Sequence, residues 1–172
     1  QIPHQKITTD TTEFKYYDID SRDRMVIKKL YLDPFMDLCN REIISYGVSS
    51  SPSAKSIVDA LNTAIEITSD CPYRRTFHSD QGWGYQMKVY VNTLQENRIF
   101  QSMSRKGNCH DNSVMENFFG IMKQEMYYGE VFYSYDELKE AIDKYIEYYN
   151  KQRIKEKLGW MSPVEYRLSQ VA

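Results

Sequence analysis

The chain has 172 residues, of which 41% are hydrophobic and 27% are charged, and its formal net charge at pH 7 is −2. These values are typical of a soluble globular protein and exclude an intrinsically disordered chain. The apolar runs fall short of the roughly 20 residues that a membrane-spanning helix needs, and the length suits one domain. Because the sequence begins with Gln1 rather than Met, we expect it to be a fragment of a longer protein.

The charge is distributed unevenly along the chain. Residues 98–123 and 144–157 each carry more lysine and arginine than aspartate and glutamate. Basic clusters of this kind are usually solvated faces, and a phosphate-binding surface is the less common alternative. The weakly acidic total disfavours a dedicated nucleic-acid-binding module. Three widely spaced cysteines without a CxxC pair favour reduced thiols in a cytosol.

The first part of the chain is rich in β-branched and aromatic side chains, which favour strands. We expect one strand over residues 6–14, a polar turn over residues 15–24, and two further strands over residues 25–38 and 41–48. The residues between the last two strands are few enough for a hairpin turn.

The rest of the chain alternates helices and short strands, and apolar residues recur at helical spacing in the longer segments. Ser134 with Glu137 and Ser162 with Glu165 are pairs typical of helix starts. In chain order we expect a helix from residue 51, a strand over 74–78, a helix over 85–96, a strand near 99–100, and helices over 111–126, from 134 and from 162. This order predicts an α/β fold with a mixed sheet, antiparallel in its early part and parallel later.

Three acidic residues are candidates for a functional site because of where they stand in the predicted elements. Asp10 stands inside the predicted first strand, where an unpaired carboxylate is unfavourable. Asp80 follows a short strand, and ligands of α/β sheets commonly lie at strand ends. Glu116 shares one flank of its predicted helix with Asn112 and Lys123. Taken singly, each acid is better explained as a capping, paired or exposed carboxylate.

The spacing of these acids and the sequence around them resemble a known family. Asp80 and Glu116 are separated by 35 residues, as in the D,D-35-E signature of retroviral integrases and bacterial insertion-sequence transposases. Similar blocks are found at residues 9–14 (TDTTEF), 78–83 (HSDQGW), 101–119 (QSMSRKGNCHDNSVMENFF), 148–153 (YYNKQR) and 162–166 (SPVEY). The chain resembles the second-reading-frame transposases that use an integrase-type core, although the helix-turn-helix region that usually precedes this core is absent from the sequence.

The resemblance implies a fold, a site and an activity. The fold is a ribonuclease-H-like mixed sheet flanked by helices, with residues 1–128 as the integrase-type catalytic core and residues 129–172 as a helical C-terminal extension of the same single domain. Asp10, Asp80 and Glu116 are the implied catalytic residues and the ligands of two Mg²⁺ ions, which Mn²⁺ can replace. The implied reaction is cleavage of phosphodiesters at transposon ends followed by 3′-hydroxyl strand transfer, that is, DNA integration and recombination.

The same resemblance implies what the protein contacts. DNA is expected to meet Asn112, Lys123, Arg105, Lys106 and Arg153. The implied partners are transposon ends and target DNA, with a homo-oligomer in the DNA complex, no membrane, and a bacterial cytoplasmic location at the nucleoid. From its residues, the loop from Ser104 to His110 should be among the most mobile segments of the DNA-free protein, because it combines Gly107 with charged residues and has few apolar anchors.

Two other functions are compatible with the sequence. One is a metal-dependent nuclease of the same fold, which cuts DNA but does not join it. The other is a DNA-binding or oligomerisation fragment without catalytic activity. A strand-transfer product distinguishes the first from a transposase, and metal-dependent cleavage excludes the second.

Overall fold

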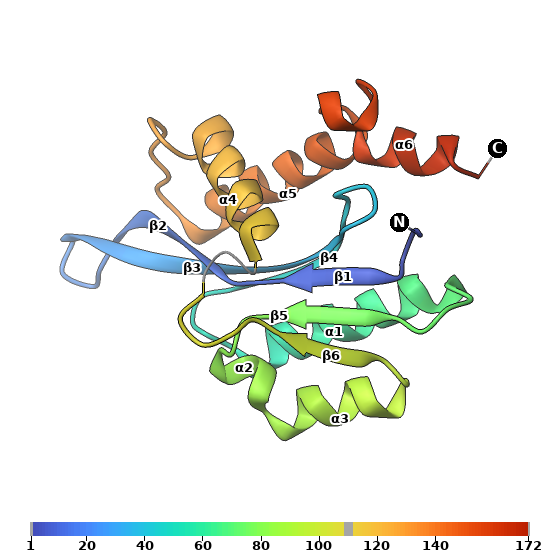
Figure 1. Ribbon diagram of the computed structural model, residues 1–172. Coiled ribbons are helices and arrows are strands. Elements are labelled where there is room, and N and C mark those ends of the chain that lie inside the picture. Colours follow the sequence, from blue (N-terminus) through green and yellow to red (C-terminus); the bar gives the residue numbers. More distant parts are fainter. Residues whose placement is uncertain (1, 109–111, 172) are drawn as a thin grey trace.

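The computed structural model describes residues 2–108 and 112–171, which form one mixed sheet with helices on both of its faces (Figure 1). The sheet order is β2-β3-β1-β5-β6, with β4 also paired to β3. The strands are β1 (Lys6–Thr9), β2 (Thr12–Ile19), β3 (Met25–Asp37), β4 (Ile43–Ser49), β5 (Thr76–Ser79) and β6 (Phe100–Met103). As predicted, β1, β2 and β4 pair with β3 in antiparallel fashion, whereas β5 is parallel to both β1 and β6.

The long strand β3 aligns the others. Leu32 pairs with β2 and β4, and Phe35 pairs with β1 and β4. The strands β1 and β2 therefore follow one another along one edge of β3, and β4 occupies the opposite edge. The interruption between β1 and β2 falls at residues 10–11, in the middle of the sheet.

Two expectations for this region are wrong. The segment predicted as one strand is two, interrupted at residues 10–11, and the predicted turn over residues 15–24 is strand as far as Ile19. The hairpin of β2 and β3 buries Phe14 and Tyr16 on one face only. Polar residues therefore alternate with the buried ones, and their abundance does not indicate a turn.

Helices cover both faces of the sheet (Figure 1). They are α1 (Ala54–Ile67), α2 (Trp83–Gln86), α3 (Lys88–Glu96), α4 (Ser113–Met126), α5 (Tyr135–Lys151) and α6 (Pro163–Ser169), with 3-10 turns at Thr68–Asp70 and Glu156–Leu158. The helix predicted over residues 85–96 is broken at Met87, whose backbone is extended. The predicted start of α4 at Asp111, and the end of the loop expected to be mobile, lie outside the described residues.

The apolar side chains form one core on each face. Adjacent residues Phe35 and Met36 of β3 point to opposite faces, as the pleat of a strand requires. The core that includes α1 and α3 is built around Ile7, Phe35, Leu61, Phe77, Tyr90 and Leu94. The core that includes α4 and α5 is built around Phe14, Leu32, Met36, Met115, Phe118, Ile142 and Tyr149.

The two C-terminal helices are fastened to the turn between β3 and β4. The side chain of Asn150 in α5 exchanges two hydrogen bonds of 2.9 Å with the backbone of Ile43. From α6, Arg167 forms an ion pair of 2.8 Å with Glu42. The predicted caps are also confirmed, because Ser134 and Ser162 accept hydrogen bonds from the third residue beyond each. No helix within the described residues is both long and apolar enough to cross a membrane.

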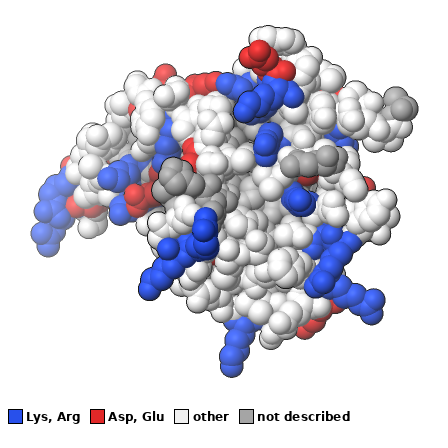
Figure 2. All heavy atoms as spheres, viewed as in Figure 1, with Lys and Arg blue, Asp and Glu red and all other residues white. Residues whose placement is uncertain are grey.

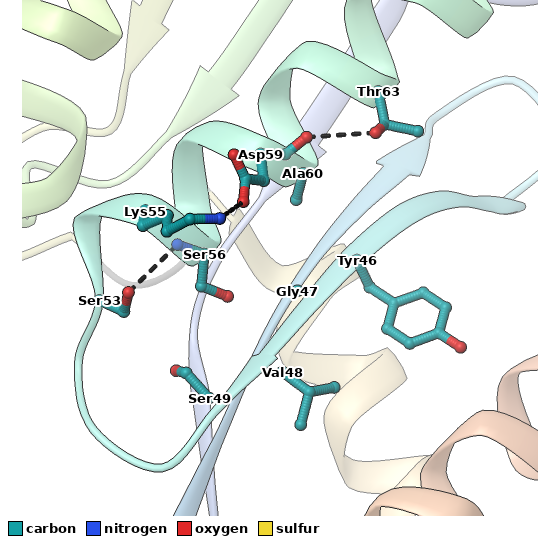
Figure 3. Close-up of a pocket in the computed structure, with 10 residues that line it drawn as sticks. All are labelled: Tyr46, Gly47, Val48, Ser49, Ser53, Lys55, Ser56, Asp59, Ala60 and Thr63. Carbon is teal, nitrogen blue, oxygen red and sulfur yellow. Dashed lines mark hydrogen bonds and ion pairs between the residues drawn. The ribbon is translucent and has the colours of Figure 1, made fainter.

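The contact between β4 and α1 depends on a glycine. A Cβ atom on Gly47 would meet the hydroxyl of Ser56 and lie 2.8 Å from the carbonyl oxygen of the same residue. A cavity of about 390 Å³ lies beside this contact, with the ion pair of Lys55 and Asp59 at its rim (Figure 3). Any larger residue at position 47 would therefore push α1 away from the sheet.

Candidate active site

Asp10 lies at the interruption between β1 and β2. Its side chain is partly buried, and its Oδ1 accepts a hydrogen bond of 2.8 Å from the backbone N–H of Thr11. Burial, with smaller contributions from the negative charges of Asp80, Glu116 and Asp33, raises the pKa of Asp10 from 3.8 to about 6, against the lowering effect of the Thr11 N–H. Asp10 therefore stands in a field of uncompensated negative charge.

Asp80 follows the end of β5, the parallel neighbour of β1. Thr8 and His78 are paired across the two strands, so Asp10 and Asp80 occupy equivalent positions two residues beyond that pair. The Oδ1 of Asp80 accepts a hydrogen bond of 2.7 Å from the N–H of Gly82. A Cβ at position 82 would lie 2.9 Å from this oxygen, so glycine permits the close turn.

Glu116 lies in the first turn of α4 and is exposed. A carboxylate in the first turn of a helix is favoured by the helix dipole. The start of α4 is held against β1 by Asn112, which accepts a hydrogen bond of 2.7 Å from Thr8 and donates one of 3.1 Å to the carbonyl oxygen of Thr9. Glu116 is thereby positioned on the side of the sheet where Asp10 stands.

Asp10 and Asp80 follow adjacent parallel strands and Glu116 acts on Asp10 through its charge, but the three predicted acids do not form a closed ligand set. Within residues 2–108 and 112–171, no three His, Cys, Asp or Glu side chains are close enough together to hold a metal ion. Asp10 and Asp80 line a common cavity of about 310 Å³, and Glu116 is outside that lining. The connection between Glu116 and the other two acids is the effect of its charge on the pKa of Asp10.

A fourth carboxylate, Asp33, lines the same cavity and was missed in the sequence. Only 2% of its surface is exposed, and its Oδ1 accepts a hydrogen bond from the hydroxyl of Thr11. Burial raises the pKa of Asp33 to about 6. The hydroxyl of Tyr85 lies 3.4 Å from that of Thr11, and burial also raises the pKa of Tyr85. An aspartate amid the apolar residues of β3 was the available signal.

The chemistry of these donors suits a hard divalent cation. All four groups offer carboxylate oxygens, the ligands that Mg²⁺ prefers, and Mg²⁺ needs only a few of them because it keeps several waters. The negative charges of Asp80, Glu116 and Asp33, which contribute to the raised pKa of Asp10 after burial, are charges that a cation would neutralise. The residues therefore fit a magnesium-type ion in their chemistry.

Two of the five predicted DNA-binding residues are engaged with the sheet. Asn112 is buried, with both ends of its amide bonded to β1. The ammonium of Lys123 donates a hydrogen bond of 3.0 Å to the carbonyl oxygen of Glu13 and lies 5.1 Å from the ring centroid of Phe14. Burial lowers the pKa of Lys123. Both side chains therefore connect α4 with the strands beside Asp10.

The other three differ in their exposure. Arg153 forms a two-pronged ion pair with Glu125, with both shortest distances at 2.8 Å, and 22% of its side chain is exposed. Arg105 and Lys106 are exposed on the loop after β6. That loop is tied to β5 by a backbone hydrogen bond of 2.8 Å from Ser104 to Ser79, next to Asp80.

The sequence matches one protein family along most of its length. Residues 1–109 match a family model described as "Integrase core domain", and residues 116–170 match a second model with the same description. An "Uncharacterized transposase-like protein" of Haemophilus influenzae is 47% identical over 165 residues, which are 96% of this chain and 71% of that protein. The "Putative transposase InsK for insertion sequence element IS150" of Escherichia coli is 46% identical over 166 residues, 96% of this chain and 55% of that protein.

Solved structures share the fold at much lower identity. The catalytic core domain of HTLV-2 integrase in complex with magnesium gives a TM-score of 0.68 at 14% identity, over 96% of this chain and 97% of that one. The catalytic domain of Mos1 mariner transposase gives a TM-score of 0.62 at 14% identity, over 84% of this chain and 70% of that one. The ribonuclease-H-like fold is thus confirmed, and the chain belongs to the integrase core domain family.

Proposed function

We propose that the chain is the catalytic core of an insertion-sequence transposase, which cleaves phosphodiesters at the ends of its element and transfers the 3′-hydroxyl ends to target DNA. Membership of the integrase core family supports this proposal. The observation that carries it is the placement of Asp10 and Asp80 at equivalent positions beyond the paired strands β1 and β5, where both line one cavity and where Asp80 and Glu116 contribute to the raised pKa of Asp10. Carboxylates that destabilise one another in this way are typical of a site built for another charge.

Asp10, Asp80 and Glu116 are the proposed ligands of two Mg²⁺ ions, which Mn²⁺ can replace. When bound, such ions supply an activated nucleophilic oxygen and a stabilised leaving oxygen. A core domain with this fold is described in complex with magnesium, and a Mos1 paired-end complex is described with Mn. Asp10, whose pKa is raised by the charges of both Asp80 and Glu116, is the proposed shared ligand.

The neighbouring residues hold these carboxylates in place. The N–H groups of Thr11 and Gly82 fix one oxygen each of Asp10 and Asp80, and the second oxygen of each is the proposed metal-binding atom. Asn112 sets the position of α4 and so of Glu116. Residues 1–128 and 129–172 act as one unit in this proposal, because α5 shares a core with α4 and the sheet.

DNA is the proposed partner, both as transposon ends and as target, with more than one copy of the chain in the complex. A solved relative in fold is a Mos1 paired-end complex with the left transposon end. Arg105 and Lys106 remain proposed DNA contacts because they are exposed beside Asp80. The proposed location is the bacterial cytoplasm, at the nucleoid when bound to DNA.

A cleavage and joining assay tests the function. The protein is incubated with Mg²⁺, labelled DNA carrying the element's ends, and a plasmid target. We expect cleaved ends and joined products from the parent, neither from Glu116→Gln, and both from the control Glu96→Gln, which replaces an exposed glutamate at the end of α3. Cleavage without joining would identify a nuclease, and binding without cleavage a non-catalytic fragment.

A further inference from the structure

A basic cavity lies against the first two turns of α4. Its volume is about 710 Å³, within the range of about 300–1,000 Å³ that is typical of ligand sites. Its walls are the turn between β3 and β4, the first two turns of α4, and the segment that connects α5 with α6. Figure 2 shows Lys and Arg side chains gathered on the face where Figure 1 places that connection.

The charge of this cavity is strongly one-sided. Its lining includes Arg41, Arg153, Lys155 and Lys157, and Glu156 is the one acid among them. Arg153 is neutralised by its ion pair with Glu125. Among the described residues, no carboxylate lies within ion-pair distance of the other three cations. These three therefore form no ion pair within the described part of the protein, and Glu125 and Glu156 offset their charge only in part.

Lys155 is the most constrained of the three. Its ammonium lies 4.8 Å from the ring centroid of Tyr149, over the floor of the cavity, and its side chain is half-buried. A half-buried cation without an anionic partner is unfavourable, so a bound anion would relieve it. Burial, with smaller contributions from the positive charges of Arg153 and Arg41, lowers the pKa of Lys155 to about 8.

The cavity adjoins the candidate active site. Asn117 lines the cavity and is the next residue after Glu116 on α4, so the two sites lie on neighbouring faces of one helix turn. A DNA strand that reaches Glu116 would have its backbone within reach of the cavity. The side-chain amide of Asn117 and the hydroxyl of Ser113 add hydrogen-bond donors to the same wall.

We propose that Arg41, Lys155 and Lys157 form a binding site for the phosphodiester backbone of DNA, distinct from the metal-binding carboxylates. That the ligand is DNA rests on the proposed function. The proposal adds to that function the surface that would bind the DNA backbone beside α4. Its recognition is electrostatic and independent of base sequence, because it rests on Lys and Arg side chains, and contacts of such side chains with phosphates carry no sequence information.

The test is the salt dependence of DNA binding. A fluorescein-labelled duplex of mixed sequence is titrated with protein in EDTA over a KCl series, and binding is followed by anisotropy. The variant Arg41→Gln/Lys157→Gln should bind more weakly, and its slope of log K against log [KCl] should be shallower by about two units. The control Lys88→Gln/Lys144→Gln removes the same charge from exposed lysines outside the cavity and should keep the parent's slope.

Equal slopes for the cavity variant and the control would overturn the proposal, and so would the absence of DNA binding by the parent. Thermal unfolding verifies that each variant is folded, and Lys157→Glu, a reversal at one exposed residue, replaces the double variant if that one does not fold. The cleavage assay is read separately. Cleavage with an unaltered slope rejects the cavity alone, and an altered slope without cleavage rejects the transposase function alone.

Discussion

The hydroxyl of Thr8 donates a buried hydrogen bond of 2.7 Å to Oδ1 of Asn112, across 104 residues of chain. The same amide donates to the carbonyl oxygen of Thr9, the residue before Asp10. One side chain thus joins the end of β1 to the start of the helix that carries Glu116. The relative position of two proposed metal ligands depends on this amide.

Asn112→Ala should weaken both the fold and the reaction. Loss of the amide leaves the Thr8 hydroxyl and the Thr9 carbonyl without these partners, which should lower the free energy of unfolding by about 1–3 kcal/mol. Cleavage should fall further than stability explains, because Glu116 loses its anchor. Urea unfolding and the cleavage assay are compared with Asn97→Ala, an exposed amide at the end of α3. Parent-like values in both measurements would remove Asn112 from this role.

Magnesium should stabilise the protein through its carboxylates. Binding to the folded state alone raises the thermal midpoint, and the gain is largest where negative charges repel one another. We therefore expect a rise on adding Mg²⁺ to EDTA-treated parent, and a much smaller rise in Asp10→Asn. Differential scanning fluorimetry at constant ionic strength measures the change in thermal midpoint, and Asp59→Asn, at an exposed position, is the control. The same rise in Asp10→Asn as in the parent would place the ion elsewhere.

Lys123→Met should act on stability rather than on DNA binding. The ammonium is bonded to the backbone of β2 and lies over Phe14, so its loss should lower the free energy of unfolding by about 1 kcal/mol. The salt slope of DNA binding should be that of the parent. Lys15→Met, at an exposed position on the same hairpin, serves as the control. A slope shallower by about one unit would instead assign Lys123 to the DNA.

Asp33→Asn should change how stability depends on pH. The pKa of Asp33 is about 6 in the folded protein and near 4 in the unfolded chain. Below about pH 4 this carboxyl does not change the free energy of unfolding, because it is protonated in both states. As the pH rises from about 4 to about 6 it lowers the free energy of unfolding increasingly, because only the unfolded chain ionises readily. The amide keeps an acceptor for Thr11 and does not ionise. Relative to the parent, the variant should therefore gain about 2 kcal/mol between about pH 4 and pH 8. Urea unfolding in EDTA across this range measures it, and a pH-independent difference would contradict the buried titration.

Lys155→Arg should remove a pH dependence from DNA binding. A phosphate in the cavity favours the charged ammonium and raises its pKa from about 8, so the parent takes up a proton on binding and its affinity falls as pH rises through 8. The neighbouring charges are Arg41, Arg153 with Glu125, and Lys157. Arginine stays protonated, so the variant should show a flat profile by anisotropy. An equal fall in both proteins would locate the titrating group elsewhere.

Sequence patterns predicted the elements whose signals are local. The serine caps of α5 and α6 are confirmed because a cap is read from residues three apart. The break at Asp10 was missed because strand composition continues on both sides of it, and only the pairing with β3 reveals two strands. Asp33 was missed because burial, not a motif, makes it unusual.

Helical spacing predicted the face of a side chain but not its neighbours. Asn112, Glu116 and Lys123 do lie along one flank of α4, as their spacing indicates. Asn112 is hydrogen-bonded to β1 and Lys123 to β2, and of the three residues only Glu116 is exposed. The identity of the opposing strand is a long-range property, so a single helix could not supply it.

The position of β1 inside the sheet affects the order in which the protein can fold during its synthesis. The strands β1, β2 and β3 are synthesised first, and their antiparallel pairing joins residues that are close in sequence. The strand β5 and the helix α4 are synthesised later. Both must then dock against β1, which lies near the start of the chain. A chain interrupted before α4 would hold Asp10 and Asp80 without Glu116. Such a chain would lack one of the three proposed metal ligands, so we expect the proposed site to be complete only after α4 has docked on β1.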